Sequence, residues 1–352
     1  MSLFKKCVDL NPNFRKPLDI GLIWEGNYWD DQDVHDCCDV DWDTVDILIR
    51  KISKSLHLQT APEESGNSEN PKNPQKILIF LPKILQLPLT ILAGYHAGFQ
   101  VSIMNPLTTK SKILKSVILA ENPKFLISVD AFWQAQELIE VKNAIEPIIS
   151  SISSTQLLII RHVSPNPGVP PPKKHFPARR PSYRTQLDLH DGRDWEWSTV
   201  MAGITVAKVP EDSSFAWKDD DVIFTFINEN GKSHPVSHTE LLDALEARKV
   251  GLEAKIGNNN HVENFLVLDF PENLNSLVDL LIPWYMGKTL TLYEGPPNYP
   301  DSSRLAQIIS KHNVNMVLGE SSPIPNPEYL KFFKVPSLKF IVSPQLSNYF
   351  KS

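Results

Sequence analysis

The sequence is poor in cysteine and glycine, and it has no excess of positive charge. Its 352 residues include three cysteines, too few for a disulfide framework. The 14 glycines stand against 29 prolines, which is few for an enzyme that binds phosphates through flexible glycine loops. With 35 basic and 41 acidic residues, the formal charge of −6 argues against a general nucleic-acid-binding protein.

Long apolar runs are also missing. No uncharged apolar window approaches the roughly 18 residues of a membrane span, and the N-terminal residues lack the apolar region of a secretion signal. We therefore expect a protein that makes no membrane contact and resides in the cytoplasm, or alternatively in the nucleus. Apolar residues still make up 41% of the chain, enough for a folded protein with a sizeable core.

Short apolar runs alternate with amphipathic segments along most of the chain. The apolar runs predict strands at 76–81, 100–104, 124–129, 156–161, 222–227, 265–268, 289–293, 314–318 and 338–342. Helical periodicity predicts helices at 43–57, 86–97, 111–121, 132–150, 238–255, 275–286 and 301–312. Ser237 and Glu240 fit a capping box, and 228–235 is expected to be a loop. This alternation predicts an α/β fold of layered, mostly parallel sheets flanked by helices.

Composition changes along the chain suggest four parts. Residues 1–75 form a polar N-terminal segment with one helix, and residues 76–163 form a first α/β subdomain. A Pro-rich basic insertion and connection occupies 164–214. A second α/β subdomain occupies 215–352.

Two local patterns leave alternatives open. The acidic stretch 30–46 contains His35, Cys37 and Cys38, which could hold a metal ion, but no second Cys or His pair follows at ligand spacing. A solvated acidic surface is the preferred interpretation, so no metal site is predicted. The segment 164–184 contains a PxxP core at 167–170, which suits either an SH3-type partner or a surface loop.

Four sequence stretches, in order along the chain, resemble the AMP-forming acyl-CoA synthetases, and among them the acetyl-CoA synthetases (acetate–CoA ligases). They are Ile23-Trp-Glu-Gly26, the strand–helix unit from Ile79 to Gly98, Asp191-Gly-Arg-Asp-Trp195, and Leu292-Tyr-Glu-Gly-Pro-Pro-Asn-Tyr-Pro-Asp301 with Arg304 and Ile309-Ser-Lys-His-Asn-Val314. The resemblance covers most of the chain. It implies the N-terminal portion of the adenylate-forming enzyme fold, and an activity that uses ATP, Mg²⁺ and CoA to convert a short-chain carboxylate into its CoA thioester.

The resemblance also points to the stretch Thr225–Pro235 as the counterpart of the family's glycine-rich phosphate loop. The residues that it assigns to a vestigial ATP site are Asn228, Asn230, Gly231 and Lys232. Of these, Gly231 and Lys232 match the family pattern, whereas Asn228 replaces a glycine.

Other residues of this stretch are unfavourable for a phosphate. Glu229 adds a negative charge, which costs about 4 kcal/mol per unit charge pair at about 4 Å and an effective dielectric near 20. Pro235 removes a backbone donor. The segment 128–135, where the family carries basic residues for CoA, has none, and Glu320 would repel a carboxylate substrate.

The family's later ATP-binding motifs and its mobile C-terminal lid, with the catalytic lysine, have no counterpart in the sequence. We therefore predict no catalytic residue, no bound cofactor and no ligase activity. The preferred interpretation is a pseudoenzyme that acts by binding, for example to a full-length acyl-CoA synthetase paralogue. Two alternatives remain open: a residual ligase or nucleotide-binding module that uses Lys232 with missing parts supplied in trans, and a truncated gene product without function.

Overall fold

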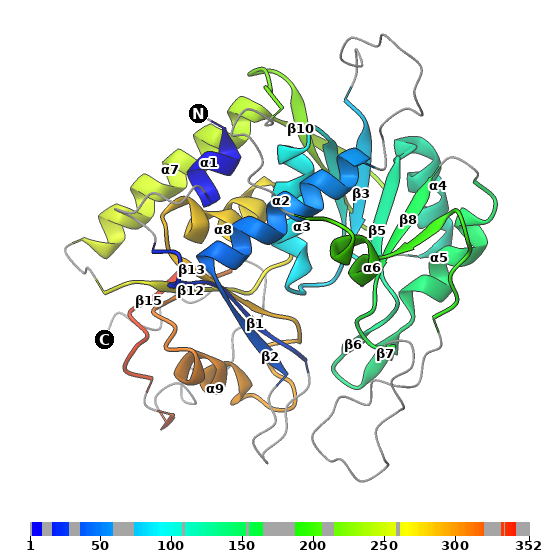
Figure 1. Cartoon of the computed structure of the whole chain (residues 1–352). Helices are drawn as coiled ribbons and strands as arrows, with labels where there is room; N and C mark the ends of the chain where they lie inside the picture. The colour runs from blue at the N-terminus through cyan, green and yellow to red at the C-terminus, as the bar shows by residue number, and fades with distance from the viewer. Residues whose placement is uncertain are drawn as a thin grey trace.

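A computed structural model describes the chain at residues 2–8, 16–27, 36–58, 74–107, 110–152, 155–164, 187–205, 215–257, 261–319, 332–333 and 335–342. The Pro-rich segment from 165, His35 and Glu320 lie outside these described residues. The described part contains two large sheets with helices between and around them (Figure 1). The predicted fold class, layered and mostly parallel sheets flanked by helices, is confirmed.

The first sheet has seven strands and is parallel except at one edge. Its order is β11 (Ser233–Ser237), β10 (Val222–Ile227), β4 (Gln100–Met104), β3 (Lys76–Phe80), β5 (Phe125–Val129), β8 (Gln156–Ile160) and β9 (Asp194–Glu196). Only β11 runs antiparallel to its neighbour β10. The inner strands are buried nearly throughout, as expected for a parallel sheet covered on both faces.

The second sheet has six strands and takes two of them from the N-terminal segment. Its order is β15 (Phe340–Val342), β14 (Met316–Leu318), β12 (Asn264–Val267), β13 (Thr289–Tyr293), β1 (Ile20–Glu25) and β2 (Cys37–Asp41). β1 pairs parallel with β13 and antiparallel with β2. The sequence analysis predicted neither strand. β2 is largely polar and exposed and lies in the acidic stretch, whereas β1 is buried along most of its length.

Nine helices appear among the described residues. They are α1 (Leu3–Val8), α2 (Trp42–Leu58), α3 (Gln86–His96), α4 (Ser111–Glu121), α5 (Val141–Ile149), α6 (Trp197–Ala202), α7 (His238–Ile256), α8 (Leu274–Tyr285) and α9 (Arg304–Lys311). α3 packs on β3 and β4, α8 packs on β12 and β13, and α1 and α2 lie among them between the sheets (Figure 1). The described residues include no helix that is long and apolar enough to cross a membrane.

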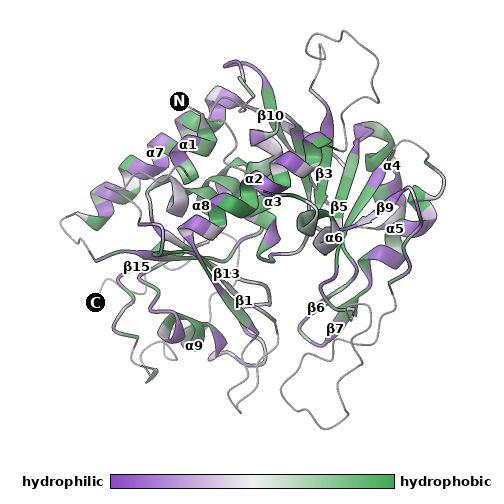
Figure 2. Cartoon of the chain, in the orientation of Figure 1, coloured by the Kyte–Doolittle hydropathy of each residue, from purple (hydrophilic) through white to green (hydrophobic). Residues whose placement is uncertain are grey.

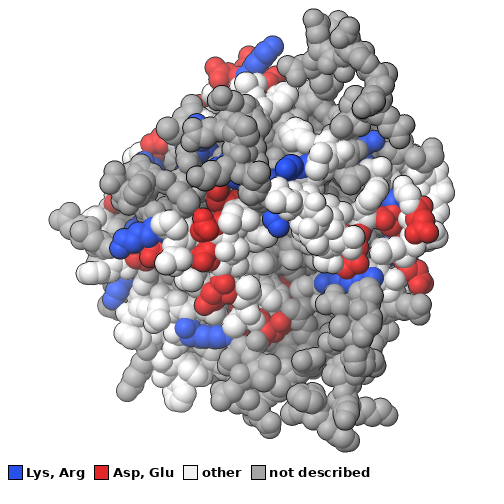
Figure 3. All heavy atoms as spheres, in the orientation of Figure 1, with Lys and Arg blue, Asp and Glu red and all other residues white. Residues whose placement is uncertain are grey.

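Hydrophobic side chains are concentrated in the strands and in the helices between the sheets, whereas α7 alternates polar and apolar residues (Figure 2). α3 is buried along almost its whole length. Three buried polar contacts join α3 to other parts of the chain through Tyr95. Tyr95 Oη accepts from the Leu3 amide and contacts His238 Nε2, and the Trp217 indole donates to the Tyr95 carbonyl. Basic and acidic side chains are interspersed on the face drawn in Figure 3.

Most predicted elements are confirmed within a few residues, and Ser237 and Glu240 form the expected capping box. The predicted helix at 132–150 is wrong in its first part. Residues 132–139 form a hairpin of β6 (Phe132–Gln134) and β7 (Glu137–Ile139), and only Val141–Ile149 is helical. Ala135 has a φ of 52°, a left-handed conformation that turns the chain and prevents a continuous helix. The predicted loop 228–235 is shorter than expected, because β11 begins at Ser233.

Candidate functional site

The predicted phosphate-loop residues lie together in the short connection between β10 and β11. β10 ends at Ile227, and the chain reverses over Asn228–Lys232 before β11 begins. Asn228 is half-buried, and Glu229, Asn230 and Lys232 are exposed. The loop therefore follows the carboxyl end of a parallel strand, which is where ligands bind in open α/β sheets.

The amides of this loop are bonded to the loop itself. Asn228 Oδ1 accepts from the amides of Asn230 and Lys232, each at 3.0 Å. The Gly231 amide donates to the Asn228 carbonyl at 2.9 Å, and the Asn228 amide donates to the Lys232 carbonyl at 3.1 Å. Four backbone donors are thus used internally, and three of them depend on Asn228 as acceptor. An asparagine in turns commonly bonds nearby amides in this way.

Gly231 holds the loop against α4. Its φ is 77°, and a Cβ at this position would lie 3.1 Å from Ile113 Cγ2 and 3.4 Å from Val117 Cγ2. The glycine that matches the family pattern therefore has a local structural reason here, a left-handed turn in close contact with a helix.

A buried carboxylate fixes the beginning of β11 to the same helix. Glu121, at the end of α4, accepts from Ser233 Oγ at 3.1 Å and from Ser102 Oγ at 3.0 Å, and it pairs with Lys76 Nζ at 3.2 Å. The side chain of Glu121 is 8% exposed. The loop is thus held at its start by β10, which pairs with β4, and at its end by β11, which pairs with β10 and is bonded to Glu121 through Ser233.

Two of the motif stretches meet in a buried ion cluster. Glu25, at the end of β1, is fully buried and bonds to Arg304 Nη2 at 2.6 Å, Lys311 Nζ at 2.7 Å and His312 Nε2 at 2.9 Å. Burial by itself would raise the pKa of Glu25, but the hydrogen bonds from His312 and Lys311 and the charge of Arg304 lower it to about 2. These motif residues connect β1 to α9 and are part of the fold.

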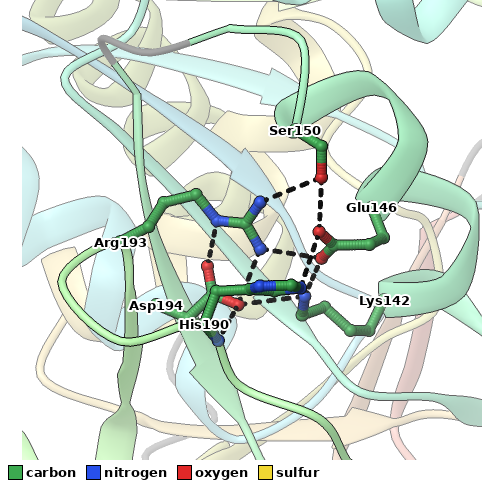
Figure 4. A network of polar contacts seen from close by, with 6 residues as sticks. All are labelled: Lys142, Glu146, Ser150, His190, Arg193 and Asp194. Carbon is green, nitrogen blue, oxygen red and sulfur yellow. Dashed lines mark hydrogen bonds and ion pairs between the residues drawn. The ribbon is translucent and has the colours of Figure 1, made fainter.

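A third motif stretch also forms a structural network, shown in Figure 4. The Arg193 guanidinium bonds Asp194 through two nitrogens, at 2.5 and 2.9 Å, and bonds Glu146 of α5 at 2.8 Å. Lys142, which is 5% exposed, pairs with Asp194 at 3.0 Å and with Glu146. Burial raises the pKa of Glu146, but the bonds from Arg193 and Lys142 prevail and lower it to about 2. The network joins the turn before β9 to α5.

Residues 128–135, where the resemblance implies basic residues for CoA, run from the end of β5 into the β6–β7 hairpin. Its tip is bonded to the turn after β1: the Ala135 amide donates to Asn27 Oδ1 at 3.0 Å, and Asn27 Nδ2 donates to the Ala135 carbonyl at 2.9 Å. The hairpin carries no basic residue from Phe132 to Ile139.

Sequence reasoning missed a polar junction between the carboxyl edges of the two sheets. Lys83, after β3, donates to the carbonyl of Leu268, after β12. His162, after β8, contacts Glu294 of the motif stretch after β13 at 2.8 Å. These residues are far apart in sequence and belong to no common motif. Their one shared signal is that each lies at the end of a predicted strand or just after it, and parallel strands end at a common edge.

The described residues contain no cluster of three or more His, Cys, Asp and Glu side chains that could hold a metal ion. Cys37 and Cys38 are exposed on β2. The other member of that candidate set, His35, lies outside the described residues, as do most of the Pro-rich segment 164–184 and Glu320.

The chain is similar in sequence and in fold to acyl-CoA synthetases. An acetoacetyl-CoA synthetase from Streptomyces lividans has the same fold, with a TM-score of 0.69 over 97% of this chain and 47% of that enzyme, at 12% identity. The acetyl-coenzyme A synthetase of Drosophila melanogaster is 22% identical over 348 residues, 95% of this chain. The chain spans 47% of that enzyme, about half its length.

A much nearer relative has no assigned activity. The uncharacterized protein ZK112.6 of Caenorhabditis elegans is 62% identical over 146 residues, which are 42% of this chain and 95% of that protein. No protein-family model matches the chain. The chain belongs to one family with this nematode protein, within the AMP-forming acyl-CoA synthetase superfamily.

Proposed function

We propose that this acetyl-CoA synthetase-like protein is a pseudoenzyme that binds no nucleotide and acts by association with another protein. The observation that carries the proposal is the closed loop Asn228–Lys232, in which the amides of residues 230, 231 and 232 all donate to Asn228. A phosphate held by a loop of this kind needs such amides as donors. Here the donors are already occupied.

Opening the loop for a phosphate would cost hydrogen bonds as well as packing. Each of the three bonds to Asn228 contributes about 1 kcal/mol net. Movement of Gly231 would also separate it from Ile113 and Val117 on α4. The residues present therefore do not fit a triphosphate in the observed conformation.

The charges of the loop give little compensation. Lys232 is exposed, so it can offer a positive charge, but the exposed Glu229 lies in the same five-residue loop. The two charges largely cancel for an approaching polyphosphate, since both act at short range in solvent. An enzyme that transfers an adenylyl group needs concentrated positive charge at this place.

Isothermal titration with Mg·ATP, and with a non-hydrolysable acyl-adenylate analogue, tests the nucleotide part of the proposal. The natural chain should show no binding tighter than about 100 µM, which corresponds to about −5.5 kcal/mol. Light scattering on the same sample establishes that it is monodisperse. Tighter binding by a monodisperse sample would refute the proposal and favour a residual nucleotide-binding module.

A restored loop makes the titration sharper. The triple substitution Asn228→Gly, Glu229→Ser and Asn230→Thr removes the internal acceptor and the acidic charge, and it returns family residue types to the loop. We expect measurable binding of Mg·ATP by this variant. Glu253→Ser, on the exposed face of α7, removes the same charge elsewhere and should leave the titration unchanged.

The proposed association is tested separately. The binding partner that we propose is a full-length acyl-CoA synthetase, because the chain has the fold of about half of such an enzyme. Size-exclusion chromatography of the chain mixed with a purified acetyl-CoA synthetase should give a common peak that neither protein gives alone. Separate elution of two folded proteins would contradict this choice of partner.

A further inference from the structure

Asn230 and Gly231 form the one Asn-Gly pair of the sequence. They lie in the connection between β10 and β11, where Asn230 is exposed and Gly231 has a φ of 77°. Within the described part of the chain, Asn230 donates a hydrogen bond through its backbone amide, and its side chain makes none. Water therefore reaches this side chain, and no described contact holds it in place.

The pair has the composition that allows an intramolecular reaction of asparagine. A backbone nitrogen can attack the side-chain carbonyl of the asparagine that precedes it, and a five-membered ring then forms. Glycine makes this attack easiest, because it has no Cβ beside the attacking nitrogen, and asparagine is a thermolabile residue. Here the two reacting atoms are Gly231 N and Asn230 Cγ. Both belong to the chain, so the reaction needs no binding pocket.

The closed loop restrains the attacking nitrogen. The Gly231 amide donates to the Asn228 carbonyl at 2.9 Å. The amides on either side of it, those of Asn230 and Lys232, both donate to Asn228 Oδ1 at 3.0 Å. The Gly231 nitrogen must leave its acceptor before it can approach the Asn230 side chain. The reaction therefore proceeds from a locally opened loop, and the bonds to Asn228 limit how often the loop opens.

We propose that Asn230 is a site of spontaneous deamidation and that Asn228 sets its rate. The Gly231 nitrogen loses its proton to hydroxide and attacks Asn230 Cγ, an N–C bond forms, and the bond from Cγ to the side-chain nitrogen breaks. That nitrogen takes a proton from water and leaves as ammonia, which yields a succinimide ring. Water then opens the ring at either carbonyl, so position 230 becomes aspartate or isoaspartate. Water is the only co-reactant, and nothing is oxidised or reduced.

The modification changes both the charge and the backbone of the loop. A carboxylate at position 230 adds to that of the exposed Glu229, so two negative charges then stand against the positive charge of Lys232. Isoaspartate also adds a carbon to the main chain, which shifts Gly231 relative to Ile113 on α4. The inference goes beyond the proposed function and does not rest on it, because the reaction involves neither a nucleotide nor a protein partner.

Incubation of the full-length chain at mildly alkaline pH, followed by peptide mass spectrometry, tests the proposal. Asn143 is the internal reference: it is exposed on α5, its side chain donates to Glu140, and the next amide, that of Ala144, donates to the Glu140 carbonyl. We expect Asn230 to be lost faster than Asn143, in proportion to hydroxide concentration, and isoaspartate to appear at position 230. Loss of Asn230 that is no faster than that of Asn143 would overturn the proposal.

Two variants at position 228 test the restraint. Asn228→Ala removes the acceptor of two loop amides, so the loss of Asn230 should become faster on the order of 10-fold. Asn228→Asp keeps an acceptor oxygen at the same position and is the matched control, which should react at nearly the natural rate. If Asn228→Ala is folded and loses Asn230 no faster than the natural chain, Asn228 does not set the rate and the assignment is wrong.

Discussion

Replacing Glu25 by glutamine removes the negative charge to which Arg304, Lys311 and His312 all bond. Arg304 is 1% exposed, so its charge would remain in the interior without this partner. Breaking a buried pair in this way costs about 3–5 kcal/mol. The pKa of Glu25 gives a consistent magnitude, because a pKa held at about 2 instead of 4.5 corresponds to about 3 kcal/mol.

The assay is urea denaturation followed by tryptophan fluorescence, for the natural chain and for Glu25→Gln. We expect the variant to lose about 3 kcal/mol of unfolding free energy at neutral pH. A carboxylate with a lowered pKa stabilises the folded state above its unfolded pKa, and this contribution is lost as the pH falls toward the folded value. The difference between the two proteins should therefore shrink between pH 4.5 and about 2.

Glu253→Gln serves as the control for the loss of a glutamate. Its side chain is 54% exposed and reaches Lys249 only at 3.9 Å, so the expected change is within about 0.5 kcal/mol. A loss below about 1 kcal/mol for Glu25→Gln, or a loss that does not depend on pH in the acidic range, would refute the assignment of Glu25 as the centre of a stabilising cluster.

Three further stability predictions use the same denaturation assay. Gly231→Ala should cost about 1 kcal/mol more than Gly192→Ala, because both glycines have positive φ but only Gly231 faces α4 closely; equal costs would contradict this packing. Arg193→Lys should lose about 1–3 kcal/mol, since an ammonium cannot reproduce the paired bonds to Asp194, and an unchanged midpoint would show that the network is dispensable. Ser237→Ala should cost about 1 kcal/mol through the lost cap of α7, and Ser198→Ala, an exposed residue of α6, should cost less.

The amino-acid pattern was sufficient to predict most of the two sheets. Buried parallel strands such as β5 read as continuous apolar runs, and the capping box at Ser237 marks the start of a helix by local chemistry alone. The pattern failed at β2, whose polar residues pair at a sheet edge, and at the β6–β7 hairpin. The hairpin tip depends on Asn27, which is 108 positions away in the sequence, and β2 is held by its pairing with β1, the strand before it, which the sequence analysis also did not predict.

The sequence by itself determined that Asn228, Asn230, Gly231 and Lys232 form one loop after a strand, and that this loop departs from the family pattern. Local chemistry decides such features, since a turn residue and its spacing act over a few positions. Only the tertiary structure decided that the loop amides bond to Asn228, that Glu25 gathers three basic side chains, and that Lys83 meets two carboxylates from the other sheet. The last two arrangements join residues from elements far apart in the chain, and the pKa values of Glu25 and Lys83 depend on burial, which sequence spacing does not define.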